Sequence, residues 1–124
     1  MSHSTTLSVP DGLLHLRDAL REFAAERDWD QFHTPKNLAI ALSVEAAELL
    51  EHFQWVGDKD PEQLTPAKLE EVSQEAADVL LYLVRLADKL NIDLIQAATS
   101  KNGRNAEKYP VDKARGSSKK YTEF

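Results

Sequence analysis

Apolar side chains recur at helical spacing along most of the chain. In the first such stretch, Leu13, Leu16 and Leu20 lie three to four residues apart, so they share one face of a helix. The same spacing continues through three more stretches, and none shows the strict alternation that marks a β-strand. The pattern predicts an all-α protein with four helices, over residues 13–27, 35–54, 66–90 and 94–108.

Local signals support these helix boundaries. Thr34 and Thr65 each precede a proline, and a capping threonine followed by proline is typical of a helix start. Asn91 is a suitable cap at the end of the third helix. The short connections favour an antiparallel four-helix bundle. The apolar stripes of the two central helices need more cover than 124 residues supply, so we expect a homo-oligomer.

Composition narrows the class of protein. The absence of cysteine excludes a disulfide framework, a zinc knuckle and a thiol nucleophile. No apolar run approaches the roughly 20 residues that span a bilayer, and the polar start has no secretion signal, so we expect a cytoplasmic protein with no membrane partner. The net charge of −6 argues against binding to a nucleic acid polymer. We expect a flexible lead over residues 1–12, one helical domain over 13–110, and a basic, polar tail over 111–124 without a core of its own.

Four acidic residues fall on or beside the apolar stripes of the two central helices. Glu45 and Glu48 are three residues apart, as are Glu75 and Asp78, so each pair can converge on one point of a helical face. Buried carboxylates are costly and repel one another unless a cation joins them. Oxygen ligands favour a hard cation, Mg²⁺, with Mn²⁺ as a possible substitute. The alternative is that these acids are partly exposed and only ring the bundle.

Charge is also divided along the chain. Residues 43–78 carry ten acidic and two basic side chains, whereas residues 101–120 carry seven basic and two acidic ones. One interpretation of this pattern is two solvated helix faces. The other is a site that binds metal and phosphate together.

Several runs of residues resemble a known family. They are residues 32–38, 43–49, 53–55 and 75–83, followed by Ser100-Lys101, Asn105 and Tyr109-Pro110. Together these runs resemble the all-α nucleotide pyrophosphohydrolases of the MazG-like superfamily, and within it the dCTP pyrophosphatase branch most of all. The likeness extends from about residue 16 to the C-terminus.

The resemblance implies a four-helix bundle that assembles as a homotetramer, built as a dimer of dimers. It implies Mg²⁺-dependent cleavage of a nucleoside triphosphate, dCTP or a modified dCTP giving dCMP and pyrophosphate, in sanitation of the nucleotide pool. The catalytic metal ligands would be Glu45, Glu48, Glu75 and Asp78, with Glu48 or Glu45 activating the water. The substrate-binding residues would be Trp29, Asp30, Gln31, Phe32 and His33 around the nucleoside, Trp55 and Tyr82 around the base or sugar, and Lys101, Asn105 and Tyr109 on the phosphates and sugar, from the same or a neighbouring subunit.

Other interpretations stay open. The same fold could act on another phosphorylated metabolite, although Trp29 and Trp55 favour a base over a bare sugar. A non-catalytic interaction protein would use the same amphipathic helices to bind a partner. Relatives can carry a histidine where this chain has Leu20, so base preference can differ. Each aromatic residue is also compatible with simple core packing.

Overall fold

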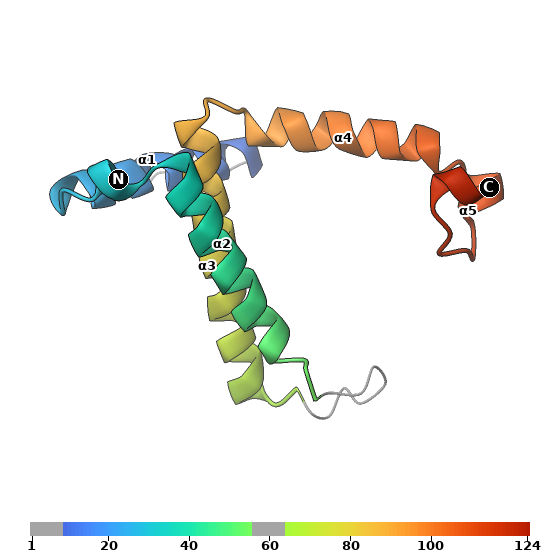
Figure 1. Ribbon diagram of the computed structural model, residues 1–124, viewed down its shortest axis with the longest axis horizontal. Coiled ribbons are helices and arrows are strands. Elements are labelled where there is room, and N and C mark those ends of the chain that lie inside the picture. Colours follow the sequence, from blue (N-terminus) through green and yellow to red (C-terminus); the bar gives the residue numbers. More distant parts are fainter. Residues whose placement is uncertain (1–8, 56–63) are drawn as a thin grey trace, which may run out of the picture. The chain divides into compact units, whose positions relative to one another are not determined.

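The structure, a computed structural model, describes residues 9–55 and 64–124, and every regular element within these ranges is a helix (Figure 1). The all-α prediction is confirmed. None of the described helices is long and apolar enough to cross a membrane. The elements are α1 (Val9–Glu26), the 3₁₀ turn η1 (Asp30–Phe32), α2 (Pro35–Glu51), α3 (Pro66–Lys89), α4 (Leu94–Lys108), the short α5 (Val111–Ala114) and the 3₁₀ turn η3 (Tyr121–Glu123).

Helix boundaries follow the predicted ones, with two differences. Helix α1 begins at Val9, four residues before the first residue of the apolar repeat, because proline is tolerated in the first turn of a helix. Helix α2 ends at Glu51, and residues 52–55 form turns instead of its last predicted turn. Residues 1–8 of the predicted lead, and most of the predicted loop between the central helices, lie outside the described residues.

The predicted caps form as hydrogen bonds. The hydroxyl oxygen of Thr34 accepts from the backbone N–H of Asn37 at 3.1 Å, and that of Thr65 accepts from Lys68 at 3.2 Å. The carboxylate of Asp93 caps α4 in the same way. Each cap satisfies an N–H group that the first turn of a helix leaves without a partner.

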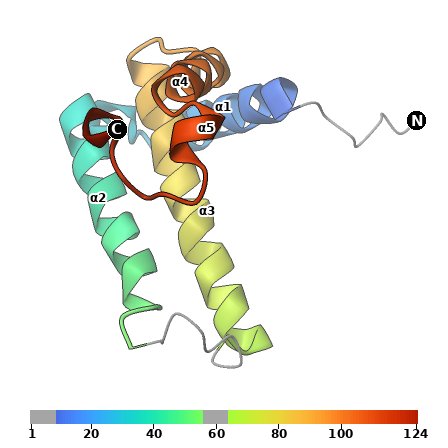
Figure 2. The same cartoon turned by 90° about the vertical axis from the view of Figure 1, so that its right-hand side faces the viewer.

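The chain forms two compact units, residues 1–91 and residues 92–124. In the first unit, α2 and α3 run side by side in opposite directions, and α1 packs against α3 (Figure 2). Three of the four long helices therefore belong to one unit, and α4 belongs to the other. Among the described residues of the first unit, the buried ones are Ala24, Leu38, Val84, Arg85 and Ala87.

Large apolar side chains on the α2–α3 hairpin stay exposed. Ile40 and Val44 on α2 and Leu69 on α3 each keep about half of their surface accessible, and Leu50 keeps 68%. A single exposed apolar side chain is normal on a protein surface, but several on one hairpin can contribute to an interaction site. The hairpin thus leaves apolar cover to be supplied from elsewhere.

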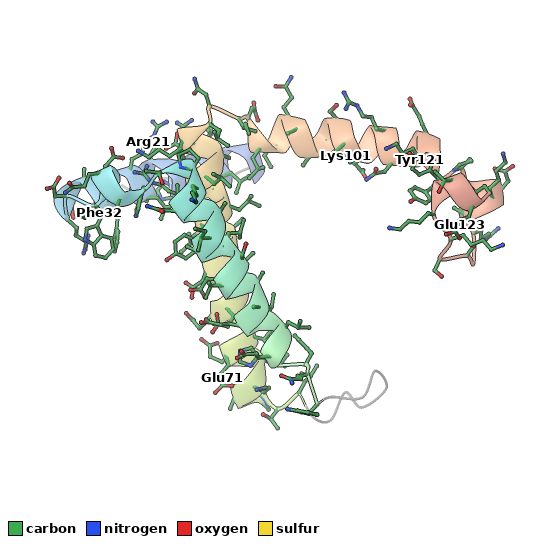
Figure 3. All side chains as sticks on the ribbon, viewed as in Figure 1. Arg21, Phe32, Glu71, Lys101, Tyr121 and Glu123 are labelled. Atoms are coloured by element: carbon green, nitrogen blue, oxygen red, sulfur yellow. The ribbon has the colours of Figure 1, made fainter. Side chains whose placement is uncertain are left out.

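The second unit consists of α4 and the segment that follows it. The ring of Tyr109, at the end of α4, meets Tyr121 at 6.0 Å and Phe124 at 5.8 Å between centroids, both edge-on. The ammonium group of Lys108 lies 5.0 Å above the ring of Tyr121. Figure 3 shows Tyr121 next to the C-terminal end of α4. The predicted tail, residues 111–124, contributes Tyr121 and Phe124 to a small aromatic cluster with Tyr109.

Candidate metal centre and adjoining pocket

Three carboxylates meet across the α2–α3 hairpin. Glu45 and Glu48 come from adjacent turns of α2, and Glu75 comes from the facing turn of α3. One oxygen of each lies within 4.8 Å of an oxygen of the other two, which is a spacing that a single cation can bridge. The predicted convergence of these three acids is therefore present in the structure.

The cluster is electrostatically unsatisfied. One carboxylate oxygen of Glu45 and one of Glu75 are buried and have no hydrogen-bond partner within the described part of the chain. Burial, with the nearby carboxylates of Glu75 and Glu48, raises the pKa of Glu45 to about 7. Buried polar atoms in folded proteins almost always have partners, so two unpartnered oxygens at one point indicate a cation-binding site.

Asp78 joins this cluster to a cavity. It is not one of the three acids with closely spaced oxygens, and its side chain is exposed. Its charge nevertheless contributes to the raised pKa of Glu45, so it lies close to the cluster. Asp78 also lines a neighbouring cavity of about 450 Å³, a volume typical of small-molecule sites.

The cavity is apolar with a few polar groups. Helix α1 provides much of the apolar wall, and the residues on either side of η1, together with α2 and α3, provide the rest. The apolar lining residues are Leu16, Ala19, Leu20, Phe23, Trp29, Leu38 and Leu81, and the polar ones are His33, Asp78, Tyr82 and Arg85. Such a site can enclose a flat, partly apolar group and orient it with a small number of hydrogen bonds.

The chain reverses sharply after α1, and this reversal positions Trp29. Asp28 adopts a left-handed backbone with φ of 55°. The N–H of Trp29 donates to the carbonyl of Ala24 at 2.8 Å, and the N–H of Asp28 donates to that of Ala25 at 3.1 Å, which is the Schellman pattern of a helix end. The indole then packs edge-on against Phe23, with ring centroids 5.7 Å apart.

A second set of hydrogen bonds fixes His33. The side-chain amide of Asn37 donates to the carbonyl of Phe32 at 2.9 Å, so the turn η1 is tied to the first turn of α2. The imidazole ring of His33 stands edge-on to Trp29 at 6.5 Å. Arg85 of α3 donates to this imidazole from the opposite helix.

The structure brings only some of the predicted substrate residues together. Trp29, His33 and Tyr82 line the cavity. Asp30 instead pairs with Arg85 and Lys89, and Gln31 bonds the preceding turn through the carbonyl and carboxylate of Asp28. The remaining predicted residues do not line the cavity: Phe32 is 59% exposed, Trp55 is 85% exposed after the end of α2, and Lys101, Asn105 and Tyr109 belong to the second unit.

Two features of the pocket were missed from the sequence. The contribution of Leu16 and Phe23 to a pocket was not predicted, because an apolar face that lines a cavity has the same spacing as one that fills a core. Arg85 was not among the predicted site residues, although it lines the cavity. Its place within the apolar stripe of α3 was a usable signal, as it was for the acids.

Comparisons with known proteins show the family to which the chain belongs. The MazG-like family matches residues 40–124 of this sequence, and the chain belongs to that family. Over 105 residues it is 49% identical to dCTP pyrophosphatase 1 of Mus musculus and 49% identical to dCTP pyrophosphatase 1 of Homo sapiens, covering 83% of this chain. The chain spans 62% of the length of these curated relatives.

A solved structure supports the same fold. The crystal structure of a pyrophosphatase from Archaeoglobus fulgidus matches with a TM-score of 0.75 and 43% sequence identity. The match covers 89% of this chain and 98% of that one.

Proposed function

We propose that this chain is a metal-dependent nucleoside triphosphate pyrophosphohydrolase that converts dCTP, or a modified dCTP, to dCMP and pyrophosphate. The observation that carries the proposal is the pair of buried, unpartnered carboxylate oxygens of Glu45 and Glu75 beside a cavity of nucleoside size. The names of the similar proteins, dCTP pyrophosphatase 1 and a pyrophosphatase, support the same reaction. Its place would be the cytoplasmic nucleotide pool.

The donor set fits a hard divalent cation. Glu45, Glu48 and Glu75 would hold Mg²⁺ or Mn²⁺, with Asp78 completing the set beside the cavity. When bound, such a cation neutralises phosphate charge and polarises the reacting phosphorus. The acids also explain why the site needs it: without a cation, their mutual repulsion and burial favour the protonated form of Glu45.

The cavity would hold the nucleoside part. Trp29 offers an aromatic surface to the base, and aromatic stacking contributes about 1–3 kcal/mol per base at nucleic-acid sites. His33 and Tyr82 offer polar atoms to the base or sugar. Asp78 lines this cavity and lies close to the other acids, so a nucleotide seated here would direct its phosphates toward the cluster.

The reaction needs a positioned water and no covalent intermediate. A free carboxylate oxygen of Glu48 or Glu45 would orient the water and accept its proton. The water oxygen would bond to the α-phosphorus while the bond from that phosphorus to the bridging oxygen breaks, and pyrophosphate leaves with the electron pair. One water is consumed for each dCMP and pyrophosphate formed.

We also propose that a homotetramer, built as a dimer of dimers, completes the site. The exposed apolar side chains of the α2–α3 hairpin, such as Ile40 and Leu50, support an assembly that covers them. In such an assembly Lys101, Asn105 and Tyr109 would contact the phosphates and sugar from a neighbouring subunit. Trp55 would gain its cover in the same way.

The test is hydrolysis in ¹⁸O-labelled water. The full chain is incubated with dCTP and Mg²⁺, and both products are analysed by mass spectrometry. We expect dCMP and pyrophosphate, with the label in dCMP, because the water attacks the α-phosphorus. A panel of canonical and modified triphosphates then ranks the bases. Label in pyrophosphate, formation of dCDP, or no turnover of any triphosphate would contradict the proposal.

A further inference from the structure

Arg85 is a buried cation beside the pocket. Its residue exposure is 5%, although arginine is almost never fully buried without partners. It lies on α3 among apolar neighbours and lines the same cavity as Trp29 and His33. A buried guanidinium that lines a cavity calls for an account of all its hydrogen bonds.

Two carboxylates balance the charge of Arg85. One terminal nitrogen donates to Asp30 at 2.6 Å, and the other lies 3.5 Å from Asp88. Each carboxylate has a second cationic partner: Arg21 of α1 donates to Asp88 at 2.7 Å, and Lys89 donates to Asp30. The pKa values of both carboxyl groups are lowered, each chiefly by the hydrogen bond from this second partner. Arg85 is thus held at the centre of a network that ties α1, η1 and α3 together.

The remaining nitrogen of Arg85 acts on His33. Its Nε donates to Nδ1 of the imidazole at 3.1 Å. A guanidinium has only donors and stays charged in proteins, so the nitrogen that it meets must carry a lone pair. The neutral imidazole of His33 therefore holds its proton on Nε2. The contact fixes the tautomer as well as the orientation of the ring.

We propose that Arg85 is a positioning residue that fixes His33 as a neutral imidazole, whose Nε2–H is the donor offered to an acceptor atom of the nucleoside in the cavity. The identity of this ligand rests on the proposed function. The tautomer itself rests only on the contact between Arg85 and His33. In the described residues, Nε2 has no hydrogen-bond partner of its own, so its proton is available to a ligand.

The surrounding charges keep His33 neutral. Burial lowers its pKa, and the positive charges of Arg85 and Lys89 lower it further, while Asp30 opposes them. Asp78, which lines the same cavity, lies close to the acid cluster. Near neutral pH the ring therefore acts as a fixed donor, and protonation would break its bond to Arg85 and place a third cation beside two others.

The first test observes the tautomer directly, in the ¹⁵N-labelled full chain without nucleotide. Nitrogen chemical shifts of His33 should show a protonated Nε2 and a bare Nδ1 at pH 7.5. Arg85→Met removes the donor at similar length, and we expect mixed tautomers and a His33 pKa shifted upward. Arg85→Gln retains an N–H donor and should restore part of the Nε2–H population. Wild-type shifts that show Nδ1 protonated, or an Arg85→Met variant that leaves the tautomer unchanged, would overturn the proposal.

Arg21→Met is the matched control. It removes the other arginine that bonds Asp88, so it weakens the same network without touching the imidazole. The tautomer of His33 should stay as in the wild type. If Arg21→Met disturbs the tautomer as much as Arg85→Met does, the network acts as a whole and the specific role of Arg85 is wrong.

The second test asks whether Arg85 acts through His33. With dCTP and Mg²⁺, Arg85→Met should raise KM about 10-fold with little change in kcat, since one ligand hydrogen bond is weakened. In a His33→Ala background the same change should have less than about a 2-fold effect. An undiminished effect in that background would overturn the proposal. Absence of any dCTP turnover would instead refute the proposed function, and the tautomer measurement would still stand.

Discussion

Helix α3 contributes to two groups of charged side chains, and they differ in how that charge is balanced. Toward its middle, Glu75 meets Glu45 and Glu48, all of one sign, and two oxygens have no partner. Toward its end, Arg85 meets carboxylates that are themselves paired with further cations. The first group is incomplete without a ligand, whereas the second is complete and serves as scaffold. On one helix, the group with unbalanced charge is therefore the candidate binding site, and the group with balanced charge has a structural role.

The largest effect is expected when the incomplete group is broken. Glu75→Gln keeps the shape of the side chain but removes a charge that the cation needs, so kcat/KM for dCTP should fall on the order of 100-fold or more. Glu70→Gln is the matched control on the same helix, because Glu70 is exposed and outside the cluster. Circular dichroism should show both variants helical. Full activity of Glu75→Gln would show that these acids do not hold the catalytic cation.

Without metal, the stability of the protein should depend on pH because the clustered acids repel one another. Glu45 has a pKa near 7 in the folded state against an ordinary value of 4.5, so the folded state binds more protons between these values. Stability must then fall as pH rises from about 4.5 to 7. Glu45→Gln cannot ionise, and its melting temperature should exceed that of the wild type by a few degrees at pH 8 but not at pH 4.5.

Divalent cation should remove this difference. Mg²⁺ binds the folded wild type and stabilises it, and the pH dependence due to Glu45 should fade. Melting curves of both proteins at several pH values, with EDTA and then with Mg²⁺, measure the effect. A wild type that gains stability over this pH range without metal, relative to Glu45→Gln, would contradict the assigned repulsion.

The ion pairs around Arg85 should make the stability of the protein depend on pH in the opposite direction. Asp88 has a lowered pKa, so its stabilising contribution is present above the ordinary value of 3.8 and is lost as pH falls through the folded-state value. Asp88→Asn weakens bonds to two arginines and should cost about 2 kcal/mol of unfolding free energy at pH 7. Urea denaturation at pH 7 with and without Mg²⁺ measures this, and the loss should be equal in both. A loss that Mg²⁺ reverses would place Asp88 in the metal-binding group instead.

The sequence predicts local features of this molecule well and distant pairings poorly. Helices α3 and α4 follow the expected bounds, because apolar spacing and the caps at Thr65 and Asp93 act within a few residues. The acid cluster could also be predicted, because acidic residues on an apolar stripe can be recognised from the sequence alone. Two partners of Arg85, Asp30 and His33, come from η1 and the residue that follows it, more than fifty residues earlier, and no local rule brings them together with Arg85.

The smallest expected loss of stability comes from an uncharged helix cap, which provides a reference for both charged groups. Thr65→Ala removes the neutral hydrogen bond that caps α3, far from Arg85 along the helix, and should cost about 1 kcal/mol. Because neither hydrogen-bond partner titrates, the loss should be the same from pH 5 to pH 8, with or without Mg²⁺. Urea denaturation under these conditions provides the neutral reference for Glu45 and Asp88. If this loss also varied with pH or metal, the variation seen at the charged groups would reflect the helix as a whole and not their charge balance.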